Sequence, residues 1–94
     1  MKKTFKLHIE GKNSDRVLDA IKHEVRKYVK RERNKTLPVG VDYWDFNCKF
    51  GLTEADAGAV HLAEITKKMD EASKGGAESF YVEILAAHGV RQKR

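Results

Sequence analysis

The sequence has little cysteine and little proline, and it has no long apolar run. Cys48 is the only cysteine among 94 residues, so no disulfide can form within the chain. Small secreted domains usually depend on disulfides, and this composition therefore gives no sign of an oxidising compartment. No apolar stretch approaches the roughly 20 residues that a membrane-spanning helix needs. We expect no membrane partner.

The first ten residues resemble a secretory signal only at their start. Lys2 and Lys3 could form the basic region of such a signal. Lys6, His8 and Glu10 then interrupt the apolar stretch that should follow. We therefore predict a cytoplasmic protein without a signal peptide.

Length and composition fit one small globular domain. Hydrophobic residues make up 40% of the chain and charged residues 35%, a balance that is too apolar for a disordered chain. A chain of 94 residues is long enough for one hydrophobic core. We predict a single α+β domain over residues 1–90, followed by a basic C-terminal tail over residues 91–94.

Charge is distributed unevenly along the chain. Residues 1–35 hold 12 basic and 5 acidic side chains, a net charge of +7. Residues 36–90 hold 4 basic and 9 acidic side chains, a net charge of −5. The tail adds +3, and the formal net charge of the whole chain is +5. The protein is therefore dipolar rather than uniformly basic.

The spacing of apolar residues predicts a strand and then a long helix in the basic half. Residues 4–10 alternate between apolar and polar side chains, which is typical of a half-buried strand. From Ser14 to Arg33 the apolar residues recur at helical spacing, and Asn13 or Ser14 can cap the helix. The apolar stripe of this helix comprises Val17, Leu18, Ile21, Val25, Tyr28 and Val29.

Two further strands and a second helix are predicted in the acidic half. Residues 43–50 alternate as a strand that places Cys48 in the core, and residues 79–85 alternate as the last strand. Residues 59–65 fit either a third strand or the start of the second helix; we prefer a strand, in a hairpin with the preceding one. The helix then runs from about Ile65 to Lys74, and Gly75-Gly76 ends it.

This order, β-α-β-β-α-β, predicts an α+β fold. We expect a two-layer sandwich of ferredoxin-like type, with a mainly antiparallel four-stranded sheet and both helices on one face of it.

The strongest functional signal is the basic side of the first helix. Its side chains lie opposite the apolar stripe and can contact a phosphate backbone, although a solvated helix face has the same composition. The candidate nucleic-acid-binding residues are Lys22, His23, Arg26, Lys27, Lys30 and Arg33. We predict a non-enzymatic binding domain that contacts nucleic acid, RNA ahead of DNA. The alternative is a protein-protein interaction or assembly module, in which an acidic partner or a second copy meets the basic segment.

Evidence for catalysis is weak in this sequence. Tyr43, Tyr81 and other polar residues fall on the expected open face of the sheet, but an ordinary polar surface is the better interpretation. A loose set of His8, His61 and nearby carboxylates has no spacing typical of a metal site or an acid–base pair. We therefore assign no catalytic residue, metal ligand or cofactor.

Four stretches together resemble a small bacterial family of basic proteins of about this length with no assigned function. They are AIKHEVRKYVKRERNKTLP, YWDFNCKFG, HLAEI and SFYVEILA, which span most of the chain. The resemblance implies no activity, and no functional residue follows from it.

Overall fold

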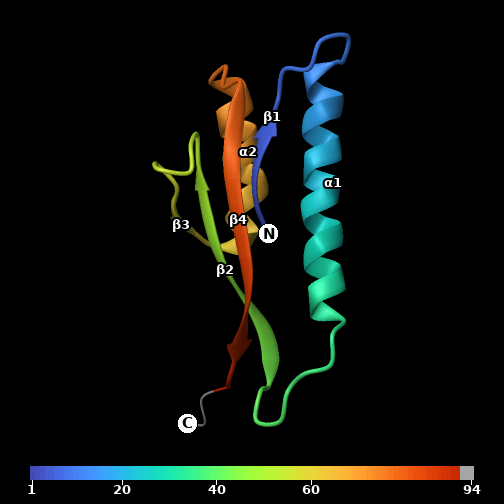
Figure 1. Ribbon diagram of the computed structural model, residues 1–94, viewed down its shortest axis with the longest axis vertical. Helices are drawn as coiled ribbons and strands as arrows, with labels where there is room; N and C mark the ends of the chain where they lie inside the picture. Colours follow the sequence, from blue (N-terminus) through green and yellow to red (C-terminus); the bar gives the residue numbers. More distant parts are fainter. Residues whose placement is uncertain (92–94) are drawn as a thin grey trace.

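The computed structural model describes residues 1–91 of the chain (Figure 1). Its elements in order are β1 (Lys2–Lys6), α1 (Ser14–Arg33), β2 (Tyr43–Gly51), β3 (Gly58–Val60), a short 3-10 helix η1 (Leu62–Glu64), α2 (Ile65–Lys74) and β4 (Ser79–Gly89). The predicted limits of both helices are confirmed. The expected α+β class is confirmed as well, because two helices accompany an antiparallel four-stranded sheet.

Helix α1 begins and packs as its sequence predicts. Of the two candidate caps, Asn13 caps the helix, and its side-chain oxygen accepts a hydrogen bond from the Asp15 amide at 2.8 Å. The apolar stripe is buried except for Tyr28, which is half-buried. Glu32 is also buried, and the Lys35 ammonium at 2.7 Å compensates its charge.

The order of strands in the sheet is β1-β4-β2-β3, and all neighbouring strands are antiparallel. A ferredoxin-like sheet would place the first and third strands at its centre. Here β4 and β2 are central, and β1 and β3 are the edges. The predicted order of elements along the chain is therefore correct, whereas the ferredoxin-like arrangement within the sheet is wrong.

Strand length explains this difference. The two central strands have 11 and 9 residues, whereas β1 has five and β3 has three. Pairing the two longest strands gives the sheet its longest hydrogen-bonded ladder. The ladder joins Tyr43–Gly51 to Tyr81–Gly89 without a break.

Three predicted strand limits need correction. Strand β1 begins at Lys2 and ends at Lys6, so Ile9 lies outside the sheet and is exposed. Strand β4 continues to Gly89 rather than ending at Leu85, because β2 provides pairing partners for the additional residues. The third strand is only three residues long, but it forms the predicted hairpin with β2.

Both helices contribute to one hydrophobic core. Ile65 and Met69 of α2 belong to the same buried cluster as the α1 stripe and alternate residues of β4, including Phe80 and Val82. Cys48 is buried within this cluster, as predicted.

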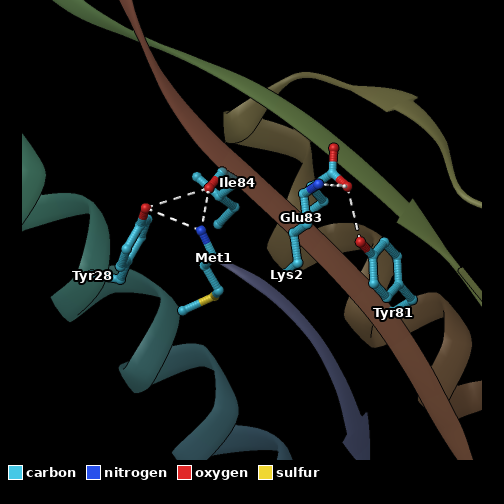
Figure 2. Close-up of polar contacts among 6 residues, drawn as sticks. All are labelled: Met1, Lys2, Tyr28, Tyr81, Glu83 and Ile84. Carbon is cyan, nitrogen blue, oxygen red and sulfur yellow. Dashed lines mark hydrogen bonds and ion pairs between the residues drawn. The ribbon is translucent and has the colours of Figure 1, made fainter.

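The first residue of the chain extends the pairing of β1 with β4 (Figure 2). The Met1 carbonyl accepts a hydrogen bond from the Ile84 amide at 2.8 Å, and the Met1 nitrogen donates to the Ile84 carbonyl at 2.7 Å. The Tyr28 hydroxyl of α1 lies 3.1 Å from the same nitrogen. Within residues 1–91, no strand pairs with residues 85–89 of β4 on this side.

The described part of the chain is elongated, measuring 50 × 24 × 20 Å. Figure 1 shows β2 and β4 continuing past the N-terminal end of β1 as a two-stranded ribbon. Within residues 1–91, no helix is both long enough and apolar enough to cross a membrane. Most of the predicted basic tail, residues 92–94, lies outside the described part.

Candidate nucleic-acid interface

A groove of about 1200 Å³ lies between α1, β2 and the segment from β3 to the start of α2. It exists because the two helices differ in length. Helix α1 has 20 residues and α2 only 10, so the helix layer leaves part of β2 uncovered. The side chains that line the groove on α1 are Val25, Arg26, Val29, Lys30 and Arg33.

The α1 wall of the groove is basic. Arg26, Lys30 and Arg33 follow one another at intervals of four and three residues, which places them along one side of the helix. All three residues are exposed. Val25 and Val29 lie beneath them and anchor the wall in the core.

The β2 side of the groove is aromatic. Trp44 is half-buried and Phe46 is buried. The Arg33 guanidinium lies 5.5 Å from the centre of the Phe46 ring, a cation–π distance. The Trp44 indole nitrogen donates a hydrogen bond to the Lys35 carbonyl at 2.9 Å, which fixes the orientation of its ring.

Carboxylates are also present in the lining of the groove. Asp45 lies on β2 and Glu64 in η1, and both residues line the groove. Asp45 accepts a hydrogen bond from the Phe46 amide at 2.8 Å. Burial raises the pKa of the Cys48 thiol, and the charge of Asp45 raises it further. Cys48 is therefore a protonated core residue rather than a nucleophile.

The groove brings together three of the six predicted site residues, Arg26, Lys30 and Arg33. Lys22 lies elsewhere, with its ammonium 2.5 Å from the Asp70 carboxylate of α2 and its side chain only 16% exposed. It therefore joins the two helices and is not part of a free basic face. Lys27 lines a smaller hollow beside Tyr28, and His23 is exposed outside the groove.

Sequence reasoning missed the aromatic part of this site. Trp44 and Phe46 alternate in the sequence like core residues. Their position relative to the short second helix depends on how the elements pack, which the sequence pattern does not show. It also missed a second hollow, between β1 and the start of α1, which Lys6, Lys12 and Arg16 help to line. The basic residues that recur before Asp19, among them Lys6, Lys12 and Arg16, are the signal that could have indicated this second hollow.

The outer face of the sheet is less open than the sequence indicated. Tyr81 is buried, and its hydroxyl donates a hydrogen bond to the Glu83 carboxylate at 2.9 Å (Figure 2). Burial raises the pKa of Tyr81 to about 12, and the bond to Glu83 contributes to the shift. Lys2 lies 4.0 Å from Glu83 on the same face. These contacts leave Tyr81 unable to stack on a base.

The histidine and carboxylate residues do not gather in the described structure. Within residues 1–91, no three histidine, cysteine, aspartate or glutamate side chains are placed to hold a metal ion. His8 instead lies 3.4 Å from the Ser14 hydroxyl.

Residues 1–94, the whole chain, match a family of unknown function (DUF6172). The protein belongs to this family. No curated protein and no solved structure matches the chain. The family membership agrees with the resemblance found in the sequence and assigns no ligand to the groove.

Proposed function

We propose that the protein is a non-enzymatic domain that binds single-stranded nucleic acid, RNA ahead of DNA, in the groove between α1 and β2. One observation carries this proposal. Three basic side chains of α1 line the same groove as the aromatic rings of Trp44 and Phe46. Positive charge along one wall and a partly exposed aromatic ring beside it, that of Trp44, are the two features that sequence-tolerant single-strand binding requires.

The basic wall is suited to the phosphates. Arg26 and Arg33 are seven residues apart on α1, so the wall extends about 10 Å along the helix axis. Each cation that contacts a phosphate releases a condensed counterion, which makes the affinity depend on salt.

The rest of the groove is suited to the bases. The half-buried ring of Trp44 is accessible from the groove and can stack against a base, since every base has an aromatic face. Asp45 and Glu64 line the same groove, where they can accept hydrogen bonds from base amino groups or from ribose hydroxyls. The ribose 2′-hydroxyl is the reason for placing RNA ahead of DNA.

The alternative, an assembly module based on the dipolar charge, receives less support. Lys22 already pairs with Asp70, and Lys3 pairs with Glu24 at 3.1 Å. Part of the opposite charge is thus neutralised within one molecule and is not available to a partner.

The test uses the only tryptophan of the chain as a reporter. A pool of short single-stranded RNA of mixed sequence is titrated into the full-length protein at low salt, and the fluorescence of Trp44 is followed. We expect binding with a changed Trp44 signal, and weaker binding to single-stranded DNA of the same sequences. The variants Arg26→Glu and Lys30→Glu should each weaken binding by about tenfold or more, a loss of about 1.4 kcal/mol.

The matched control is Lys27→Glu, which makes the same charge change on an exposed face of the same helix outside the groove. It should weaken binding far less than Arg26→Glu does. Neutralising one groove cation with Arg26→Gln should reduce the slope of log affinity against log salt by about 0.7. Equal effects of the two glutamate variants would reject the groove, and no binding to either nucleic acid at low salt would reject the function.

A further inference from the structure

Part of β4 has a free edge without any protecting feature. The amide and carbonyl of Ile84 bond with Met1 on the β1 side of the strand. Because the direction of backbone groups alternates along a strand, those of Ala86 and His88 point to the same side. No described strand pairs with β4 there, and both residues are exposed.

The other edges of the sheet are protected against pairing. Strand β1 carries Lys2, Lys3 and Lys6, and lysine opposes strand addition at an edge. Strand β3 is only three residues long. On the free part of β2, the Asp45 carboxylate already accepts the Phe46 amide hydrogen. Residues 85–89 of β4, with the sequence LAAHG, contain no formal charge and no proline.

We infer that residues 85–89 of β4 pair in antiparallel fashion with the same residues of a second copy of the chain, forming a two-fold symmetric dimer with a continuous sheet. A two-fold axis at Ala87 places Ala86 of each copy opposite His88 of the other. The backbone groups of both residues already point outward, so the two pairs exchange four hydrogen bonds.

The length of the free edge fits this register. Met1 occupies the position beside Ile84, and β4 ends at Gly89. Residues 85 to 89 are therefore available for pairing on this side of β4. A two-fold axis at Ala87 pairs all five of these residues with the same five residues of the second copy.

The side chains around the edge agree with the same axis. On the outer face, Leu85 of each copy lies opposite Gly89 of the other, which has no side chain. The ring of Tyr43 covers that glycine and is 41% exposed, while Leu85 is 39% exposed. The dimer brings these two apolar surfaces together and places no like charges opposite each other.

The first test measures the mass of the full-length protein by sedimentation over a range of concentrations. We expect a reversible dimer for the unmodified chain. Ala86→Pro removes an amide hydrogen that no strand within residues 1–91 accepts, and Ala87→Lys places two ammonium groups beside the axis. Each variant should raise the dimer dissociation constant by about tenfold or more while circular dichroism remains unchanged. Thr4→Lys on β1, away from this edge, is the matched control and should remain dimeric.

A second measurement fixes the register. The pairing predicts a non-hydrogen-bonded pair at Ala87, with α-carbons about 4.5 Å apart, a distance that a disulfide can span. Ala87→Cys should form a disulfide-linked dimer on mild oxidation. Leu85→Cys should not, because its copies would lie about 13 Å apart. Cys48 is buried and does not interfere.

Three results would overturn the inference. The first is a strictly monomeric protein at high concentration. The second is a dimer that neither Ala86→Pro nor Ala87→Lys weakens and that Ala87→Cys does not link. The third is a co-purifying protein of another sequence that Ala87→Lys releases, because the edge would then belong to that partner. None of these results depends on the nucleic-acid groove, since all three can be measured without nucleic acid.

Discussion

At the residue scale, several side chains have roles that their type alone does not indicate. Lys22 belongs to a basic run in the sequence, yet its ammonium pairs with Asp70 between the two helices. Tyr81 alternates as an outward residue of a strand, yet it is buried beside Glu83. The spacing of residues in the sequence indicates which face of an element a side chain occupies. It does not indicate which residues of the folded protein that side chain contacts.

Tyr81 provides a prediction about pH. Its folded-state pKa, about 12, lies above the ordinary value of 10. The folded state therefore favours the neutral phenol, and this contribution is fully present below pH 10 and is lost as the pH rises from about 10 towards 12. We expect Tyr81→Phe to show a smaller fall in melting temperature across this range than the unmodified protein.

The same measurement on Tyr43→Phe serves as the control, because Tyr43 is an exposed residue at the other end of the sheet. Every other titratable side chain is the same in the unmodified protein and in each variant, so the difference between the curves reports on the substituted tyrosine. If the melting temperatures of Tyr81→Phe and the unmodified protein fall in parallel, the role assigned to Tyr81 is wrong.

At the element scale, the hairpin of β2 and β3 depends on one glycine. A β-carbon at Gly51 would lie 2.7 Å from the backbone of Ala57, closer than a β-carbon approaches other non-hydrogen atoms in folded proteins. We expect Gly51→Ala to destabilise the protein by about 1–3 kcal/mol, because the backbone of the turn must move. Urea unfolding monitored by circular dichroism measures this change.

Gly58 of the same hairpin is the matched control. A β-carbon there meets no atom within 4 Å, so Gly58→Ala should leave stability within about 0.5 kcal/mol of the unmodified value. Similar losses of stability in the two variants would show that the turn does not constrain Gly51.

At the scale of the whole molecule, the sheet has two unequal halves. Residues 81–84 of β4 are flanked by β2 on one side and by β1 with Met1 on the other, and most of their side chains are buried. Residues 85–89 pair only with β2. The groove arises because α2 is too short to cover all of β2. The free edge arises because β1 is too short to pair with the whole of β4.

This division predicts the pattern of amide hydrogen exchange. In dilute protein, the amides of residues 81–84 should exchange slowest, through unfolding of the whole domain. The Ala86 and His88 amides should exchange nearly as fast as in an unfolded chain, because no strand within residues 1–91 offers them an acceptor. Exchange measured by NMR tests this order, and equal protection of the two halves of β4 would contradict it.

The sequence by itself determined the elements of this protein. The helical spacing of apolar residues, together with the glycine or proline that follows each helix, predicted the positions of α1 and α2. The alternation of apolar and polar residues predicted β2 and the start of β4. These patterns can be read from the sequence because side chains on the same face recur about every 3.6 residues in a helix and every two residues in a strand. The basic wall of the groove was also predictable, since Arg26, Lys30 and Arg33 lie on one helix face.

Only the tertiary structure decided how these elements meet. The strand order follows from which strands offer the longest ladder, and β4 extends to Gly89 because β2 runs beside it. The basic wall and Trp44 line the same groove because α2 is shorter than α1. These arrangements depend on contacts between segments that are distant in the sequence, such as Met1 with Ile84, and no local period in the sequence records such contacts.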